Sequence, residues 1–294
     1  MKKIVVLIAL LLMLLMLCAC TTEPAQLVVI PNAQTTAIPS QPAHTAEPSL
    51  IVIMTYVPTV EPTAVPATPT PTPIPSPTPS PTPEPTRDPN RKMVALTFDD
   101  GPTDEYTPLI LDILEQYGAK ATFFTQGNRL KDKGAILDRM VSLDCQIGCH
   151  GWDHTKMTTQ TRTQMQNDFT RACDRINSTV TGGYTVTVMR PPYGDTDGSV
   201  TSAMKGIGLS IIKWNVDSRD WESRNANSVY DLCTENLQSG QILIFHDKFQ
   251  TTVDAIERLV PYLIENGYDL VTVTELIESS GEPLQAGKIY RSRP

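Results

Sequence analysis

Two neighbouring aspartates, Asp99 and Asp100, are the first residues of this sequence whose types and spacing could do chemistry. They follow an apolar run, Met93 to Phe98, that is typical of a buried strand, and they precede a Gly-Pro turn. Because successive strand side chains point to opposite sides, adjacent carboxylates can take different tasks, one binding a metal ion and the other moving a proton. Turn chemistry alone also explains Asp-Asp-Gly-Pro, so the rest of the chain must decide between these interpretations.

The same arrangement, an apolar run followed by polar or ionisable residues, recurs four times downstream. The segments that follow these runs are His150-Gly151-Trp152-Asp153-His154, Arg190-Pro191-Pro192-Tyr193-Gly194, Asn215 to Trp221, and His246-Asp247. All three tryptophans, and every histidine except His44, lie within or beside these segments. A single histidine or tryptophan is more often structural, but their joint placement at strand ends predicts one shared site.

The spacing of two histidines indicates a metal site. His150 and His154 are four residues apart, which lets two imidazoles bind one ion. With Asp100 they form a set of two histidines and one carboxylate, and three protein ligands leave a position open for water, as in catalytic metal sites. Gly151 excludes the H-E-x-x-H metalloprotease signature, which requires Glu after the first histidine.

The cysteines offer an alternative metal site. Cys145 and Cys149 together with the two histidines could form a closed structural zinc site, but Cys149 adjoins His150 in an extended segment and should face the other way. With Cys173 and Cys233, four cysteines lie in the part of the chain expected to fold, and they allow three full disulfide pairings or none. Sequence alone does not choose among these states.

Seven strand-like runs alternate with six helical patterns between residues 91 and 280. The expected strands are 93–98, 121–125, 146–149, 185–189, 209–214, 241–245 and 270–273, and the expected helices are 106–117, 132–143, 161–180, 199–205, 228–238 and 252–265. Parallel strands need helical crossovers, so this alternation predicts an α/β fold, a distorted barrel of seven or eight βα units. A doubly wound open sheet is the alternative.

The N-terminus reads as an export signal. Lys2 and Lys3 precede an apolar run from Ile4 to Leu17, which is too short for a comfortable membrane span. The residues from Leu17 to Cys20, Leu-Cys-Ala-Cys, resemble the lipobox of bacterial lipoproteins, which implies cleavage before Cys20 and lipidation of its thiol. An uncleaved signal anchor is the alternative. In both cases we expect the protein to be held at the outer face of a membrane.

Residues 21–90 differ from the rest in composition. They contain 18 of the 25 prolines, and Thr-Pro and Ser-Pro alternate from Ala67 to Thr86, so we expect a disordered tether. The apolar stretch 50–57 inside it has no assigned role. Removal of Lys2 and Lys3 leaves 22 basic and 32 acidic residues, a formal charge of −10. An acidic chain of this kind argues against nucleic acid as a partner.

Five motifs, in order, carry a resemblance to a known family. They are T-F-D-D-G, H-x-x-x-H, R-P-P-Y-G, D-x-x-D-W and L-I-F-H-D, and the resemblance covers residues 91 to about 277. The set resembles the polysaccharide deacetylases, metal-dependent carbohydrate esterases that include peptidoglycan, chitin and xylan deacetylases. The resemblance implies a distorted βα barrel that removes N-acetyl or O-acetyl groups from polymeric sugars.

The resemblance also implies the roles of individual residues. Asp99 would be the catalytic base and His246 the catalytic acid, with Arg190 holding Asp99 and Asp220 pairing with His246. The metal ligands would be Asp100, His150 and His154. The expected reaction is attack of a metal-bound water on the acetyl carbonyl, with Asp99 taking a proton from that water and His246 protonating the leaving amine.

Three further residues would contact the substrate. The resemblance implies that the backbone N–H of Tyr193 helps to bind the oxyanion, and that Trp221 and Ile244 line the pocket for the acetyl methyl group. Gly151 departs from the family pattern, which usually has Ser or Thr at that place, so we expect a somewhat looser metal site.

These observations predict a four-part chain: a lipoprotein-type signal at 1–20, a linker at 21–90, a catalytic domain at 91–280 and a C-terminal tail at 281–294. The expected function is removal of N-acetyl groups from N-acetylglucosamine residues of a polysaccharide, foremost peptidoglycan, by a monomer with one divalent ion. Zinc is the expected ion, and cobalt, nickel and manganese accept the same ligands. The alternatives are a deacetylase of an exopolysaccharide or O-acetylated xylan, and an inactive glycan-binding module.

Overall fold

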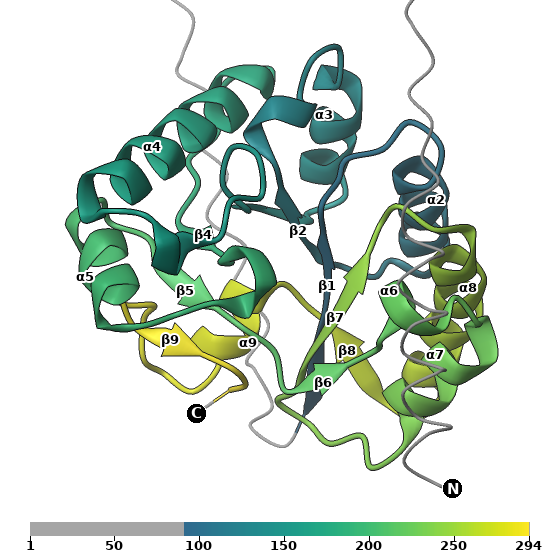
Figure 1. The fold of residues 1–294 in the computed structure, drawn as a ribbon. Coiled ribbons are helices and arrows are strands. Elements are labelled where there is room, and N and C mark those ends of the chain that lie inside the picture. Colours follow the sequence, from purple (N-terminus) through teal and green to yellow (C-terminus); the bar gives the residue numbers. More distant parts are fainter. Residues whose placement is uncertain (1–90, 294) are drawn as a thin grey trace, which may run out of the picture. The chain divides into compact units, whose positions relative to one another are not determined.

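The folded part of the chain is a curled parallel sheet with helices around its outside (Figure 1). The computed structural model describes residues 91–293. The predicted signal at 1–20 with Cys20, the linker at 21–90 and the stretch 50–57 lie outside the described residues and stay predictions. Within residues 91–293, no helix combines the length and apolar character that crossing a membrane requires.

Nine strands from the described part of the chain form the sheet, and every pairing between them is parallel. They are β1 (Lys92–Asp99), β2 (Thr122–Thr125), β3 (Gln146–Cys149), β4 (Val188–Met189), β5 (Ser210–Ile212), β6 (Val216–Asp217), β7 (Ile242–His246), β8 (Tyr268–Leu270) and β9 (Ile289–Tyr290). The order is β6-β7-β1-β2-β3-β4-β5-β9, with β8 beside β1. Because β1 to β5 are neighbours in chain order, the distorted barrel is confirmed and the doubly wound alternative is excluded.

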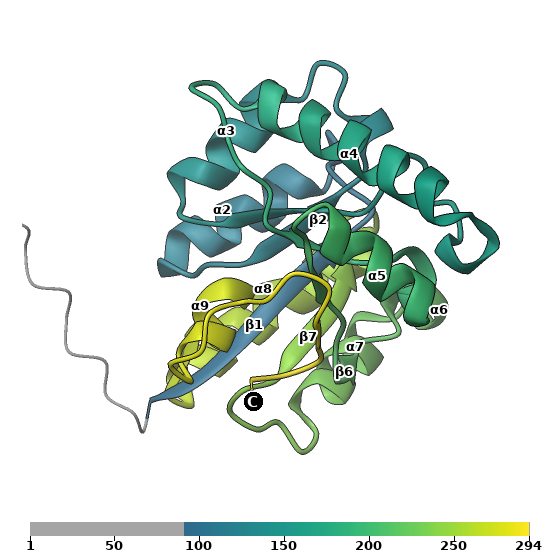
Figure 2. The same cartoon turned by 90° about the vertical axis from the view of Figure 1, so that its left-hand side faces the viewer.

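The helices of the described residues surround the sheet, the longer ones around its outside and α9 against its inner face, and Figures 1 and 2 show them from two directions. They are α2 (Thr107–Tyr117), α3 (Gly134–Ser142), α4 (Arg162–Thr179), α5 (Gly198–Gly206), α6 (Asp220–Ser223), α7 (Ala226–Thr234), α8 (Gln250–Glu265) and α9 (Val273–Glu278). The six longer ones, α2 to α5, α7 and α8, correspond to the six predicted helices. Each buries its apolar side in the core between the helices and the sheet. Because the strands are parallel, their carboxyl ends and the loops that follow them meet at one rim.

The alternation of side chains along β1 decides which residues reach the inside of the barrel. Val94, Leu96 and Phe98 belong to the large core between the sheet and the outer helices. Met93 and Ala95 belong to a second, inner cluster that includes residues of α9. Since strand side chains alternate, Thr97 and Asp99 also point to the inner face. Asp99 lies buried there, at the end of the strand.

The prediction of a strand at 270–273 is wrong except for Leu270. β8 ends at Leu270, and Val273 begins α9. The cause is a capping box: the side chain of Thr272 accepts from the backbone N–H of Glu275, and the Glu275 side chain accepts from the N–H of Thr272. The pattern T-x-x-E was present in the sequence, and it is a helix start rather than a strand end.

The predicted tail at 281–294 also differs from the structure. Ile289 and Tyr290 form β9, which pairs with β5, and Tyr290 is buried against the inner cluster. An isolated antiparallel bridge between Gln241 and Ser292 brings the same segment to the start of β7. Two residues of strand give too short a pattern to detect, so this part of the sheet could not be predicted from the sequence.

Candidate active site

The inner face of β1 ends in a buried ion pair. The guanidinium of Arg190 is fully buried, and its Nη1 donates to Oδ1 of Asp99 and to Oγ1 of Thr97, each over 2.7 Å. Its other nitrogens donate to the backbone carbonyls of Ile212, over 3.3 Å, and Lys213, over 3.1 Å. A buried charge is tolerated where its donors are satisfied in this way, and the arrangement fixes the direction of the Asp99 carboxylate.

Asp100, His150 and His154 lie together beside this ion pair. Oδ1 of Asp100 is 3.4 Å from Nε2 of His154 and 3.6 Å from Nε2 of His150. One ligand atom from each residue lies within 4.8 Å of the others, a spacing that suits a divalent ion. Nδ1 of His150 is 2.8 Å from the carbonyl oxygen of Arg190, so this ring can donate there and keep the lone pair of Nε2 for a metal.

The protonation of these side chains also suits a metal. Burial, with the nearby His150, lowers the pKa of His154 in spite of the opposite effect of Asp100, so its imidazole is neutral at physiological pH. Burial raises the pKa of Asp100, but His150 and Lys248 outweigh it and hold the pKa well below its usual value. Metal ligands must be deprotonated, and both groups meet that condition.

The local backbone explains the glycine at position 151. Gly151 has φ +78°, in the region that favours glycine, and a Cβ there would lie 3.0 Å from Oδ2 of Asp168. The two ligands that flank it are nonetheless held: His150 is buried at the end of β3, and the His154 ring stacks edge-on against Tyr193 at 4.4 Å between centroids. The looser metal site that Gly151 suggested stays a prediction.

The alternative zinc site formed by cysteines is not supported. Cys145 and Cys149 belong to the outer core, and all four cysteines between residues 91 and 293 are buried and free. The two cysteines thus face away from the histidines, as the alternation along β3 indicated. In that same range, the only group of three or more potential ligands close enough to share an ion is the one formed by Asp100, His150 and His154.

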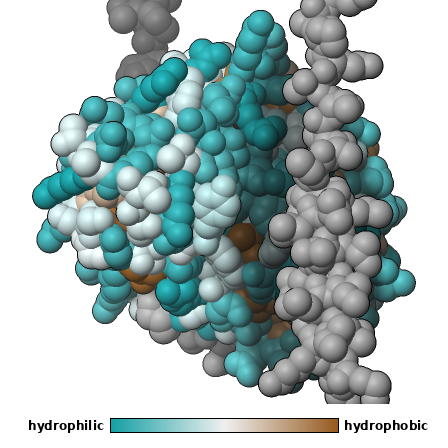
Figure 3. Space-filling view, in the orientation of Figure 1, coloured by the Kyte–Doolittle hydropathy of each residue, from teal (hydrophilic) through white to brown (hydrophobic). Residues whose placement is uncertain are grey.

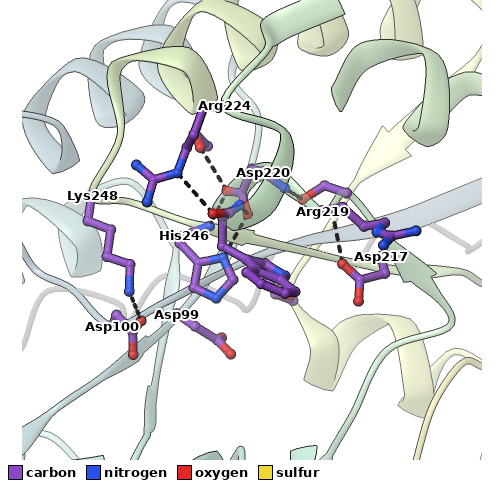
Figure 4. A network of polar contacts seen from close by, with 12 residues as sticks. Asp99, Asp100, Asp217, Arg219, Asp220, Arg224, His246 and Lys248 are labelled. Carbon is purple, nitrogen blue, oxygen red and sulfur yellow. Dashed lines mark hydrogen bonds and ion pairs between the residues drawn. The ribbon is translucent and has the colours of Figure 1, made fainter. Parts of the chain in front are cut away.

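His246 stands across from the metal-ligand cluster, at the end of β7. β7 pairs with β1 so that His246 is in register with Asp99. Nδ1 of His246 is 2.7 Å from Oδ1 of Asp220, and Oδ2 of Asp220 accepts from the backbone N–H of His246 and from Thr252, each over 2.7 Å. Figure 4 shows the ring between Asp220 on one side and Asp99 and Asp100 on the other.

The environment of His246 favours its charged form. Burial favours the neutral imidazole, but the hydrogen bond and the charge of Asp220 outweigh burial, with further help from Asp99 and Asp100, and raise the pKa of His246 above its usual value. An imidazolium that persists near neutral pH is suited to protonate a leaving group.

Replacing Asp220 with asparagine should therefore narrow the pH range of activity. The asparagine removes the charge that raises the pKa of His246, so the acid loses its proton at lower pH. We expect the alkaline limb of the kcat/KM profile to move to lower pH. Asp254→Asn, an exposed carboxylate on α8, is the matched control. An alkaline limb that stays in place would show that Asp220 does not tune the acid.

A cavity of about 430 Å³ joins these groups. Besides the metal-ligand cluster and His246, its lining includes Tyr193, Trp214, Trp221 and Ile244. On the face drawn in Figure 3, hydrophilic residues cover most of the visible surface. Among the described residues, Tyr193 and Trp221 are the most exposed large apolar side chains, at 68% and 52%. Exposed aromatic faces beside a polar cavity are suited to pack against sugar rings.

Tyr193 is held in an unusual backbone conformation. Its φ is +60°, which is uncommon for a residue with a large side chain, and it belongs to the turn Pro192–Gly194. Gly194 follows with φ +62°, and a Cβ there would lie 2.7 Å from the Trp214 ring. The motif R-P-P-Y-G thus forms one wall of the cavity. The predicted role of the Tyr193 N–H in binding an oxyanion stays a prediction.

Sequence reasoning missed two side chains that contact Asp100. Gln126 follows β2, and Lys248 lies two residues after His246. Their place just after the carboxyl ends of β2 and β7 is a sequence signal for the rim of the barrel, but the sequence does not show which residue their side chains contact. Asp217 was noted only as part of its motif, and it lines the cavity with its Oδ2 accepting from Nε1 of Trp214 over 3.3 Å.

Asp247, next to the proposed acid, gives the fold a pH dependence. Burial, with the charges of Asp100 and Asp99, outweighs a hydrogen bond from Thr107 and raises the pKa of Asp247 to about 7. The folded chain therefore keeps this proton up to about pH 7, whereas the unfolded chain loses it near pH 4. Stability from this group is fully present below about pH 4 and is lost progressively as the pH rises to about 7.

Asp247→Asn should remove that dependence. Between pH 4 and pH 7 the metal-free wild type should lose on the order of 4 kcal/mol of unfolding free energy relative to the variant, as three pKa units imply. Urea unfolding of both proteins at several pH values measures the difference. A constant difference across this range would mean that Asp247 is ionised in the fold.

Comparisons with known proteins place the chain among enzymes. A family model described as polysaccharide deacetylase matches residues 86–212. The peptidoglycan-N-acetylglucosamine deacetylase PgdA of Listeria monocytogenes is 37% identical over 199 residues, which are 68% of this chain and 41% of that protein. A peptidoglycan-N-acetylglucosamine deacetylase of Bacillus cereus is 32% identical over 193 residues, 64% of this chain and 89% of the relative. The chain spans about two fifths of the first curated relatives it matches.

Solved structures share the fold. A family 4 acetyl xylan esterase from Clostridium thermocellum, in complex with a cobalt ion, has a TM-score of 0.64 and 30% identity. The match covers 69% of this chain and 100% of that one.

Proposed function

The chain belongs to the polysaccharide deacetylase family, and from that premise we propose that it removes N-acetyl groups from the N-acetylglucosamine residues of peptidoglycan. The observation that carries the proposal is the geometry of a single cavity. A candidate metal site formed by Asp100, His150 and His154 lies between a carboxylate held by Arg190 and a histidine held by Asp220. Hydrolysis of an amide needs a base for the attacking water, an acid for the leaving amine and a group that polarises the carbonyl, all within one cavity.

The residues of the cavity divide the proton transfers between them. A divalent ion bound by the three ligands would polarise the acetyl carbonyl and lower the pKa of water. Asp99 accepts the proton of the attacking water, and Arg190 keeps the carboxylate aimed at it. His246 gives a proton to the departing amine, since an amine leaves only when protonated. Tyr193, through its N–H, binds the oxyanion, and Ile244 and Trp221 contain the methyl group.

The ligand set narrows the metal ion to a few candidates. Two imidazoles and one carboxylate suit zinc, and cobalt, nickel and manganese accept the same donors. We propose zinc as the resident ion. The relative from Clostridium thermocellum was solved with cobalt.

Peptidoglycan is proposed as the substrate because the relatives from Listeria monocytogenes and Bacillus cereus carry that name. O-acetylated xylan is the second candidate, and the acetyl xylan esterase with the same fold favours it. The charged form of His246 argues for the amide. Without protonation the nitrogen would have to leave as an amide anion, which is a far stronger base than an alkoxide, so the ester depends less on an acid. An inactive glycan-binding module is disfavoured because base, acid and all three ligands are present together.

We also propose a location at the outer face of the cell membrane, within reach of the wall. The sequence supports this: the charged and apolar segment at 1–17, the lipobox-like residues ending at Cys20, and the Pro/Thr-rich residues 21–90. A polyproline-like chain of seventy residues would extend on the order of 200 Å. Mass spectrometry of the mature protein tests the lipid on Cys20, and an intact N-terminal signal would instead favour the uncleaved anchor.

The substrate is tested with defined acetylated sugars. The purified protein is incubated with peptidoglycan fragments, chitin oligomers and acetylated xylan, and mass spectrometry locates each lost acetyl group. We expect loss from glucosamine units of peptidoglycan. Loss from muramic acid or xylan alone would overturn the substrate while leaving the deacetylase in place, and binding without any acetate release would favour the glycan-binding module.

A further inference from the structure

Two side chains that the proposed mechanism does not use contact the carboxylate of Asp100, one on each oxygen. Nε2 of Gln126 donates to Oδ1 over 2.7 Å, and Nζ of Lys248 forms an ion pair with Oδ2, as Figure 4 shows for the lysine. Oδ1 is also the oxygen that faces Nε2 of His150 and of His154. The two oxygens of this carboxylate therefore have different surroundings.

Gln126 is built into the structure and oriented by its neighbours. Its side chain is buried, and its Oε1 accepts from Nε of Arg129 over 3.3 Å, which turns the amide so that Nε2 faces Asp100. Its backbone N–H donates to the carbonyl of Gly101 over 3.2 Å and ties the loop after β2 to the turn that carries Asp100. Gln126 thus holds Oδ1 toward the two histidines.

Lys248 approaches the same carboxylate from the loop after β7. Its side chain is about one third exposed, and its Nζ also lies 5.4 Å from the centre of the Phe249 ring. An ammonium only donates hydrogen bonds, so a charged lysine cannot itself bind a cation. Its hydrogen bond takes up one lone pair of Oδ2, and its positive charge opposes a second cation beside that oxygen. The neutral amide on Oδ1 leaves a lone pair there and adds no charge.

We propose that Gln126 and Lys248 are positioning residues that make Asp100 a one-oxygen metal ligand. Gln126 presents Oδ1 to the ion, and Lys248 keeps Oδ2 away from it, so that positions on the ion stay open for water and the acetyl oxygen. The inference rests on the proposed function, because it concerns the metal of that site. It assigns opposite effects on metal affinity to the two side chains.

Substitutions that keep the size of each side chain can separate the two effects on metal affinity. Lys248→Met keeps the stem and removes the charge, so Oδ2 becomes free and repulsion is lost, and we expect Zn²⁺ to bind about tenfold more tightly. Gln126→Leu removes the donor that orients Oδ1, and we expect binding about tenfold weaker, as for other partners of metal ligands. Lys248→Arg keeps a cation and should stay close to the wild type. Gln146→Leu, at the start of β3, is the control for replacing a glutamine that does not contact Asp100.

Competition with a chromophoric chelator measures these affinities without any substrate. The visible absorption of the Co²⁺-loaded protein gives a second readout, and it should change in Lys248→Met, because an added carboxylate oxygen alters the ligand field. Equal or weaker Zn²⁺ binding by Lys248→Met, with an unchanged cobalt spectrum, would overturn the inference while the proposed function stands. A wild-type chain that binds no divalent ion would overturn both.

Discussion

Replacing Asp99 with asparagine should lower the rate of deacetylation by about 10²- to 10⁴-fold, the usual contribution of a general base. Asparagine has nearly the same shape and still accepts a hydrogen bond from Arg190, but it cannot take a proton from water. The three proposed metal ligands are unchanged, so metal content should stay close to that of the wild type. Acetate release from an N-acetylated glycan, measured beside metal content, checks both parts.

The matched control is Asp231→Asn, which removes an exposed carboxylate on α7. It should retain wild-type activity. If Asp99→Asn kept more than about a tenth of the activity, another group would have to be the base. If it lost its metal as well, Asp99 would be a ligand rather than the base, a distinction that matters because its Oδ2 lies 3.8 Å from Nε2 of His150.

Arg190→Met should damage the fold as well as the reaction. The methionine fills part of the volume, but it leaves the buried Asp99 carboxylate without its charged partner and the carbonyls of Ile212 and Lys213 without a donor. Removing one partner of a buried ion pair costs about 3–5 kcal/mol. We expect a loss of that size in the unfolding free energy, together with loss of deacetylation, because Asp99 is no longer aimed at the water.

A double variant separates the ion pair from the packing around it. In Asp99→Asn with Arg190→Met the orphaned charge is gone, so the double variant should be more stable than Arg190→Met alone. Denaturant unfolding of the four proteins gives the coupling energy. Arg190→Lys should not rescue activity, because one ammonium cannot reproduce the four contacts of the guanidinium. Additive effects of the two single changes would mean that the pair contributes nothing specific.

Much of the fold followed from local pattern. The buried runs before Asp99 and His150 gave β1 and β3 because each combines apolar residues with a turn signal at its end. β6 and β9 were missed because two residues carry no period, and their pairing with β7 and β5 depends on contacts distant in sequence. The helix that starts at Val273 was missed because valine and threonine favour strands, whereas the Thr272 capping box decides the conformation.

The metal ligands of the site could be predicted because they belong to motifs that directly follow strands. Asp100, His150 and His154 come together because parallel strands end at one rim, a general property of the fold. The contact of Gln126 and Lys248 with Asp100 was not predictable, since it depends on the directions of two side chains from loops after β2 and β7. The backbone of Tyr193, with its positive φ, likewise follows from tertiary packing.

Metal removal and return test the central claim most directly. The purified protein is freed of metal with a chelator, and acetate release from N-acetylated peptidoglycan fragments is followed as Zn²⁺ is added back. The account predicts that the metal-free protein releases no acetate and that activity rises to a plateau at one ion per chain, with no recovery in His154→Ala. Full activity in the presence of the chelator, or a plateau in His154→Ala equal to that of the wild type, would contradict it.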